Sequence, residues 1–215
     1  MTTRALEVAR ALVEIGAVGF SPHAPITFKS GLLSPVYVDN RRLPYWPAHW
    51  RTIIQAFRQC IAERDWTIDV IAGIEAAGIP HSAALGYVME TPSVFVRKQV
   101  KEHGTRSRIE GGPVKDKRVL LVEDLVTTGS SSLAGVEALQ AEGANVVACL
   151  AIVSYGFPEA RDGFARAGVP FEALTDFESI LTVAHEQGRF STEERAVIED
   201  WLRDPHGWAE RRTAS

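Results

Sequence analysis

Continuous apolar runs alternate with stretches of helical periodicity through the middle of the chain. The apolar runs lie at 68–74, 93–96, 119–122 and 144–153. Such runs are typical of strands that are buried on both faces of a sheet. Because helical patterns separate them, we expect parallel strands joined by helical crossovers. The pattern therefore predicts an α/β fold built on a doubly wound parallel sheet.

Helical periodicity also marks the two ends of the chain. Amphipathic helices are predicted at 3–18 and 47–63, with a further helix at 81–90. Another helical period opens at Leu133 and closes at Gly143, a residue type that often caps helix C-termini.

The last part of the chain predicts two more helices. They lie within 175–204 and are separated at Gly188, and a capping box at 191–194 opens the second. Residues 209–215 are expected to fray. Three residues near this end are expected to pack and not to bind: Trp201, Pro205 and Trp208.

Composition and charge narrow the class of protein. A chain of 215 residues is long enough for one domain with a real core. The net charge of −4 argues against a nucleic-acid-binding surface, which is usually basic. Cys60 and Cys149 lie in apolar segments and are expected to be buried free thiols. No apolar run is long enough to span a membrane, so we expect a soluble, cytoplasmic protein with no membrane partner.

The candidate chemistry centres on residues 117–135. The apolar run at 119–122 leads into Glu123 and Asp124, expected where the strand ends, and then into a turn of small and hydroxylated residues at 127–132. A strand, such a turn and a helix N-terminus form a cradle for an anion. Two carboxylates would repel a bare phosphate, but they suit a ligand that also carries hydroxyls or a divalent cation. The alternative is an ordinary α/β crossover with solvated acids.

The string Val-Leu-Leu-Val-Glu-Asp-Leu-Val-Thr-Thr-Gly, residues 119–129, resembles the phosphoribosyl-pyrophosphate (PRPP) motif of type I phosphoribosyltransferases. No Gly-Lys-Ser or Gly-Lys-Thr is present, so it is not a Walker loop. The resemblance implies that the two acids hold the ribose hydroxyls and that Thr127 to Ser131 bind the 5′-phosphate. The PRPP-binding residues implied here are Glu123, Asp124, Leu125, Val126, Thr127, Thr128, Gly129, Ser130 and Ser131.

A second string is similar to the N-terminal signature of orotate phosphoribosyltransferases. It runs Thr-Phe-Lys-Ser-Gly-Leu-Leu-Ser-Pro-Val-Tyr-Val-Asp-Asn-Arg over 27–41. In that family this segment forms a small hood over the base, and its lysine reaches the site. The resemblance therefore implies that Lys29 and Thr127 bind orotate.

The loop at 97–108 reverses the charge of the chain, with five positive side chains against one negative. By itself such a run is most often a solvated loop. However, it resembles the mobile catalytic loop of orotate phosphoribosyltransferases, which closes over PRPP, often in the neighbouring subunit. The resemblance implies PRPP contacts from Arg97 and Lys98, and catalytic roles for Lys101 and His103 together with Asp124. Loop closure would also exclude water.

A glycine-containing turn at 73–78 is a third candidate loop. It reads either as a close-packed strand-to-helix turn or as a second anion loop. The family places its pyrophosphate loop here, and some members carry a lysine where this chain has Ala77. Ligands of doubly wound sheets bind at the carboxyl ends of the strands, where 73–78, 97–104 and 123–131 all lie. We therefore expect one shared site.

One position departs from the family pattern. Some members place an arginine just after the strand at 144–153 to hold the orotate carboxylate. Here Tyr155 and Gly156 follow that strand, and the nearest arginine is Arg161. The sequence therefore leaves open how the carboxylate is bound.

Together the resemblances imply an orotate phosphoribosyltransferase of pyrimidine (UMP) biosynthesis. Orotate and PRPP would give orotidine 5′-monophosphate and pyrophosphate, with Mg²⁺ held mainly by substrate and water and by no direct protein ligand. One domain, 1–215, is expected, with a hood from about 1–42 and C-terminal helices at about 175–208 on a core at about 65–174. A homodimer that shares the 97–108 loop is also implied. The alternatives are a phosphoribosyltransferase for another base and a PRPP-sensing regulator that binds nucleic acid.

Overall fold

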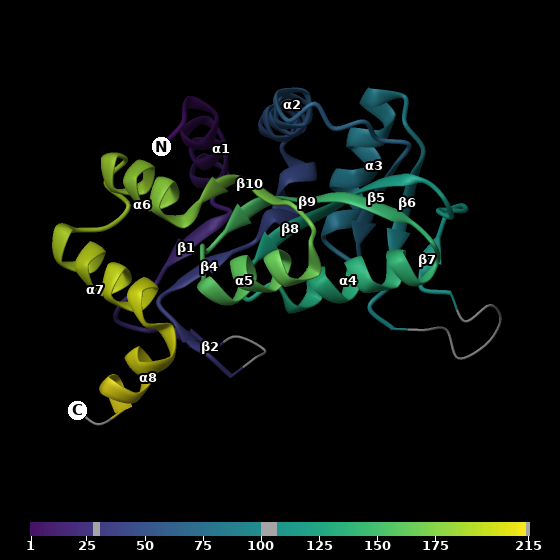
Figure 1. Ribbon diagram of the computed structural model, residues 1–215. Helices are drawn as coiled ribbons and strands as arrows, with labels where there is room; N and C mark the ends of the chain where they lie inside the picture. Colours follow the sequence, from purple (N-terminus) through teal and green to yellow (C-terminus); the bar gives the residue numbers. More distant parts are fainter. Residues whose placement is uncertain (28–30, 100–106, 214–215) are drawn as a thin grey trace.

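A six-stranded sheet forms the centre of the computed structural model, which describes residues 1–27, 31–99 and 107–213 (Figure 1). The strand order is β10-β9-β8-β5-β6-β7, and all neighbours except β6 and β7 are parallel. The sheet confirms the predicted α/β class. Its strands are β5 (Val70–Ile74), β6 (Ser93–Val96), β7 (Ile109–Glu110), β8 (Arg118–Val126), β9 (Asn145–Ser154) and β10 (Phe171–Asp176).

Helices cover both faces of this sheet. Helices α1 (Thr3–Glu14), α2 (Pro47–Glu63) and α3 (Gly78–Met89) lie on one face, and α4 (Ser130–Ala141) and α5 (Pro158–Ala167) on the other (Figure 1). Two hydrophobic clusters result, one on each face. Both layers exclude water from the central strands, which explains why those strands are continuously apolar.

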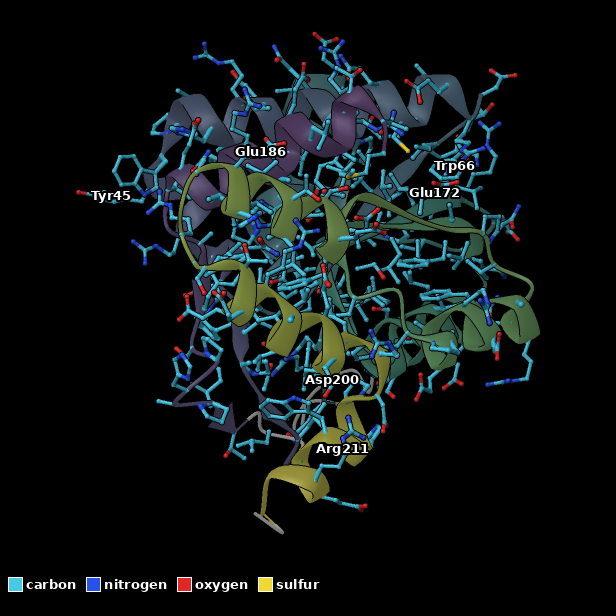
Figure 2. The ribbon with its side chains drawn as sticks, turned by 90° about the vertical axis from the view of Figure 1, so that its left-hand side faces the viewer. Tyr45, Trp66, Glu172, Glu186, Asp200 and Arg211 are labelled. Carbon is cyan, nitrogen blue, oxygen red and sulfur yellow. The ribbon has the colours of Figure 1, made fainter. Side chains whose placement is uncertain are left out.

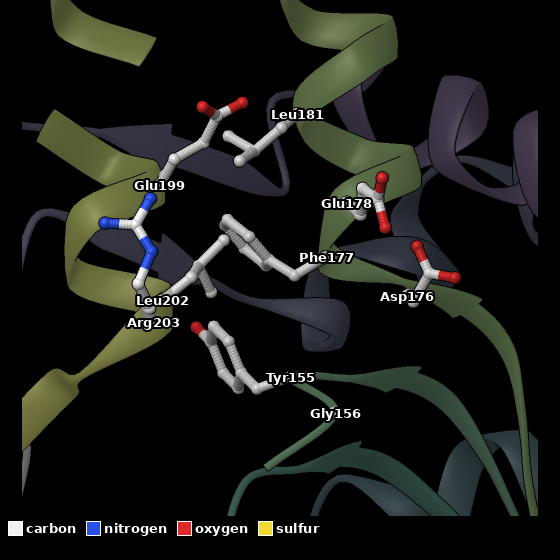
Figure 3. Close-up of a pocket in the computed structure, with 9 residues that line it drawn as sticks. All are labelled: Tyr155, Gly156, Asp176, Phe177, Glu178, Leu181, Glu199, Leu202 and Arg203. Carbon is white, nitrogen blue, oxygen red and sulfur yellow. The ribbon is translucent and has the colours of Figure 1, made fainter. Parts of the chain in front are cut away.

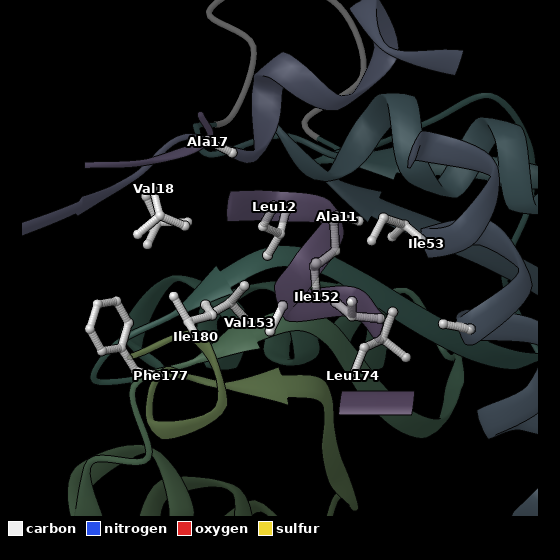
Figure 4. Close-up of a cluster of buried hydrophobic side chains, with 14 of the residues drawn as sticks. Ala11, Leu12, Ala17, Val18, Ile53, Ile152, Val153, Leu174, Phe177 and Ile180 are labelled. Carbon is white, nitrogen blue, oxygen red and sulfur yellow. The ribbon is translucent and has the colours of Figure 1, made fainter. Parts of the chain in front are cut away.

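Successive residues of β8 divide between the two clusters. Leu120 and Val122 belong to the cluster under α1, α2 and α3, whereas Val119 and Leu121 belong to the cluster under α4 and α5. This alternation is the period of two that a strand imposes on its side chains. Figure 4 shows part of the first cluster, where residues of α1, β9 and α6 (Phe177–Glu186) meet: Leu12, Ile152 and Ile180.

Short N-terminal strands and the C-terminal helices lie beside the sheet. The strands β1 (Val18–Phe20) and β4 (Val36–Val38) pair with each other, as do β2 (Ile26–Thr27) and β3 (Leu33–Ser34). A 3₁₀ helix, η1 (Asn40–Tyr45), follows β4, and α7 (Thr192–Arg203) and α8 (Pro205–Thr213) end the chain. The indole Nε1 of Trp201 donates to the carbonyl of Leu33 at 2.8 Å, which joins α7 to the N-terminal strands.

Several expectations from the sequence are confirmed. Trp201 and Trp208 are buried, and the Ser191–Glu194 capping box forms in both directions. Cys60 and Cys149 are buried and free. Within the described ranges, no helix is both long and apolar enough to cross a membrane.

Two expectations are wrong, and two elements were not predicted. Strand β8 does not end before Glu123 but continues to Val126, because it keeps pairing with β9 as far as Ser154. Helix α8 extends to Thr213 where fraying was expected, because Trp208 packs into the core. The sequence also did not predict α5 and β10; β10 is an edge strand whose first three residues are only half-buried.

Candidate active site at the carboxyl end of the sheet

The loop after β8 is held in shape by Gly129. This residue has φ +81°, a conformation that L side chains rarely adopt, and a Cβ there would lie 3.2 Å from the Cα of Ala160 on α5. The loop therefore needs glycine for two reasons, its backbone conformation and its close packing. The result is a tight turn from Val126 directly into α4.

The first turn of α4 is open to an anion. No side chain caps it in the part of the chain that the structure describes. The hydroxyls of Thr128 and Ser130 lie 3.1 Å apart and are themselves hydrogen-bonded. Uncapped backbone N–H groups and the positive end of the helix dipole favour a phosphate at this place.

The acid pair lies at the end of β8, directly before this turn. Glu123 is buried, with 5% of its surface exposed. Its Oε1 accepts from the backbone N–H of Asp124 at 3.1 Å, and Ser132 Oγ donates to its Oε2 at 3.4 Å. Burial raises the pKa of Glu123 well above its usual range, and the charge of Asp124 adds to that shift. Burial also raises the pKa of Asp124.

The carboxyl end of β8 pairs on one side only. Strand β5 reaches Val122, whereas β9 follows β8 to Val126. On its open side, Asn40 of η1 is buried and its Nδ2 donates to the carbonyl of Asp124 at 2.8 Å. Asn40 therefore attaches the N-terminal segment to the acid pair. The sequence contains Asn40 in the hood string, but this contact joins residues 84 positions apart and could not be predicted.

The β5–α3 turn packs closely against the acid pair. A Cβ at Gly73 would lie 2.7 Å from the carbonyl oxygen of Gly78, and a Cβ at Gly78 would lie 2.6 Å from that of Val122. Both positions therefore require glycine. Glu75 extends the site toward β6, since its Oε2 accepts from the backbone N–H of Lys98 at 3.0 Å.

Two of the described cations of the 97–108 loop, Arg97 and Lys98, lie at the end of β6. Arg97 Nη1 is 3.2 Å from Glu110 Oε1, so its charge is already paired within the protein. The ammonium of Lys98 acts on Glu123, whose pKa it lowers against the larger effect of burial. The structure thus brings Arg97 and Lys98 to the edge of the sheet where residues 123–131 lie. Lys29, Lys101 and His103 lie outside the described residues.

The loop after β8, residues 127–129, is the candidate phosphate loop. A cavity of about 460 Å³ opens beside it. It lies between the loop, the N-terminal strands and α8, and it is large enough for a nucleobase. Thr127, a predicted orotate-binding residue, is part of its wall. The residues that line it are Gly31, Leu32, Leu33, Thr127, Thr128, Phe157, His206, Ala209 and Glu210. The contribution of α8 was missed, because this end of the chain was expected to fray.

A second cavity, of about 520 Å³, lies between α6 and α7 (Figure 3). Asp176, Glu178 and Glu199 line it together with Arg203, so carboxylates outnumber cations there. Such a lining disfavours phosphate. Tyr155 forms part of its wall and is buried against Phe177 and Trp201. None of the predicted substrate residues that the structure describes lines this cavity.

Arg161 of α5 is the first arginine after β9 in the chain. Its side chain is 76% exposed, and its Nε lies 3.2 Å from Asp162 Oδ1. Arg161 is also absent from the described lining of the cavity beside the phosphate loop. The carboxylate of a base in that cavity would need another partner.

Comparison with known proteins identifies the class and then the family. Residues 41–167 match the phosphoribosyl transferase domain, which defines the class as phosphoribosyltransferase. The chain is 38% identical to the orotate phosphoribosyltransferase of Coxiella burnetii over 95% of this chain and 98% of the relative. It therefore belongs to the orotate phosphoribosyltransferase family.

Solved structures agree with this assignment. The orotate phosphoribosyltransferase of Aeropyrum pernix matches with a TM-score of 0.73 and 28% identity, over 86% of this chain and 99% of that chain. The enzyme of Mycobacterium tuberculosis in complex with PRPP matches with a TM-score of 0.64 and 26% identity, over 82% of this chain and 98% of that chain.

Proposed function

We propose that this chain transfers the ribose 5-phosphate group of PRPP to orotate, giving orotidine 5′-monophosphate and pyrophosphate in pyrimidine biosynthesis. The observation that carries the proposal is the arrangement at the end of β8. An acid pair, with Glu123 buried and Asp124 half-buried, precedes an uncapped helix N-terminus in the same segment, with a base-sized cavity beside it. These features suit a ligand that combines hydroxyls, a phosphate and an acceptor base.

The 5′-phosphate would bind the turn from Thr127 to Ser131, through backbone N–H groups and hydroxyls. Glu123 and Asp124 would accept from the ribose 2′- and 3′-hydroxyls. When the base displaces pyrophosphate, positive charge builds on the ribose ring. The acid pair would stabilise that charge from a site with little water, where electrostatic effects are strong.

Pyrophosphate would leave toward the β5–α3 turn and the 97–108 loop. Ala77 offers no charge there, so backbone N–H groups of the turn would be the donors. Lys101 and His103 would neutralise the leaving group once the loop closes, with Arg97 and Lys98 adding further phosphate contacts. For Arg97 this requires exchange of its Glu110 partner for phosphate.

Mg²⁺ dependence is part of the proposal. Among the described residues, no group of three or more His, Cys, Asp and Glu side chains could hold a metal ion. The ion would be held mainly by pyrophosphate, ribose hydroxyls and water, with Glu123 and Asp124 acting through those hydroxyls. Bound in this way, Mg²⁺ would supply charge neutralisation to the leaving group.

A homodimer that shares the 97–108 loop and a cytoplasmic location complete the proposal. Tyr45 and Tyr87, on η1 and α3, are 82% and 87% exposed, and exposed aromatic side chains suit a subunit interface. The two buried free thiols suit a reducing compartment.

To test which base the protein uses as acceptor, ultraviolet absorbance is followed in mixtures of protein, PRPP and Mg²⁺. Orotate, uracil, adenine and hypoxanthine are supplied in parallel. We expect loss of orotate alone. Reaction with another base and not with orotate would contradict the orotate assignment while leaving PRPP chemistry in place. PRPP binding without reaction of any base would favour the regulator.

A further inference from the structure

The cavity beside the phosphate loop has a wall that the hood and the PRPP motif do not supply. Helix α8 contributes His206, Ala209 and Glu210, which are spaced i, i+3 and i+4 and so lie on one helix face. The facing walls are apolar or hydroxylated, with Leu32, Leu33, Phe157 and the two threonines of the phosphate loop. A flat pyrimidine ring fits such a lining.

Helix α8 is firmly attached to the rest of the protein. Trp208, two positions after His206, is 3% exposed. Asp204 accepts from the backbone N–H of Gly207 at 3.0 Å and fixes the start of the helix. Arg211 lies 2.7 Å from Asp204 and 3.2 Å from Asp200 of α7, and Figure 2 shows Asp200 and Arg211 close together. These contacts fix the helix face that lines the cavity.

Among the described residues that line this cavity, His206 is the candidate partner for an anionic substituent. Among the lining residues that the structure describes, His206 is the side chain that can carry a positive charge. Arg203 and Arg211 both pair with carboxylates of α7 and its C-cap. Arg161 points to solvent beside Asp162. His206 also lies in the first turn of α8, where the helix dipole favours an anion.

Resting on the proposed function, we propose that His206 binds the carboxylate of orotate in this cavity. The imidazole donates a hydrogen bond to the carboxylate, while Thr127 and the apolar wall hold the ring. His206 thereby determines that the enzyme selects a pyrimidine with a carboxylate.

The test uses two ligands that differ only in that carboxylate, orotidine 5′-monophosphate and uridine 5′-monophosphate. Their dissociation constants are measured by calorimetry for the wild type, His206→Ala and His206→Arg. We expect His206→Ala to weaken orotidine 5′-monophosphate about 10- to 100-fold, the usual effect of losing a hydrogen bond to a charged group. Uridine 5′-monophosphate should change less than about 2-fold, and His206→Arg should restore the preference.

A matched control separates recognition from structure. His23→Ala removes an exposed histidine that lies beside Glu194, outside the lining, and should change neither constant. In steady-state assays, His206→Ala should raise the KM for orotate and largely preserve kcat.

Two results would overturn the inference. Equal weakening of both nucleotides by His206→Ala would indicate a structural role, and an unchanged preference would place the carboxylate elsewhere. In either case a wild type that consumes orotate keeps the proposed function intact. A wild type that binds neither nucleotide and consumes no orotate would contradict both proposals.

Discussion

Glu123 lowers the stability of the folded chain at the proposed site. Its carboxylate is buried beside a second acid, and its described hydrogen-bond donors are one hydroxyl and one backbone N–H. Desolvation and the charge of Asp124 both disfavour ionisation, which raises the pKa of Glu123. A ribose that donates two hydroxyls to the acid pair would offset part of the free-energy cost of burying the charged carboxylate.

Replacing Glu123 with Gln should therefore stabilise the protein and impair catalysis. Because the folded-state pKa of Glu123 is raised, the folded chain binds more protons than the unfolded chain above about pH 4.5. Stability from this group is therefore lost as pH rises toward the folded pKa, and E123Q should remove that loss. Urea unfolding from pH 5 to pH 8 measures it, and kcat/KM should fall about 100-fold. An unchanged pH dependence of unfolding would contradict this reading.

His81 should make the protein sensitive to acid. It is fully buried on α3, and Trp50 Nε1 donates to its Nδ1 at 3.0 Å. Burial lowers the pKa of His81 from 6.5 to about 4. The unfolded chain therefore takes up a proton first as pH falls, and stability should drop by about 3 kcal/mol between pH 7 and pH 4.

The variant His81→Gln should lose most of this acid sensitivity, because glutamine keeps an acceptor for Trp50 and cannot be charged. Urea unfolding at pH 7 and pH 5 compares the variant with the wild type. His23→Gln is the matched control, since His23 is exposed. Equal pH dependence in wild type and H81Q would rule out His81 as the cause.

At the scale of elements, the β8–α4 unit combines sheet, phosphate loop and helix N-terminus in one continuous segment. Gly129 makes the turn possible through its positive φ and its approach to α5. Gly156 has a similar φ of +74°, but a Cβ there would meet no heavy atom within 4 Å. Substitution at Gly156 therefore tests backbone strain alone, whereas substitution at Gly129 tests strain and crowding together.

Gly129→Ala should cost more than Gly156→Ala. Both variants incur the left-handed penalty of about 1 kcal/mol, and only Gly129→Ala also displaces the phosphate loop from α5. We expect a larger drop in Tm for G129A and at least about 10-fold weaker PRPP binding, with near-normal binding by G156A. Thermal unfolding and calorimetry measure both. Equal losses in the two variants would mean that the contact with Ala160 is unimportant.

At the scale of the whole molecule, the elements that could be predicted are those with a pattern in consecutive residues of the sequence. Strands β5, β8 and β9 were predictable because both of their faces are covered, which leaves continuous apolar runs. Strand β6 was predictable because its short run after Ser93 is apolar. The mixed burial of β10 removes that signal. The site loops were predictable because the residues of each are consecutive in the chain.

The remaining site contacts join segments that are distant in sequence. Asn40 reaches the backbone of Asp124 across 84 positions. His206 and Thr127 line the same cavity because α8 packs against β3. Each residue is an unremarkable polar side chain in its own segment, so no local pattern predicts its role.

The most direct test combines activity and site in one assay. Orotate loss and pyrophosphate release are followed together with PRPP and Mg²⁺, for the wild type and for Asp124→Asn, with thermal unfolding as the check that both are folded. We expect the wild type to consume orotate and release pyrophosphate in equal amounts, and D124N to lose about 100-fold or more in kcat/KM. A folded wild type that leaves orotate unchanged, or a D124N variant with full activity, would contradict an orotate phosphoribosyltransferase site at the end of β8.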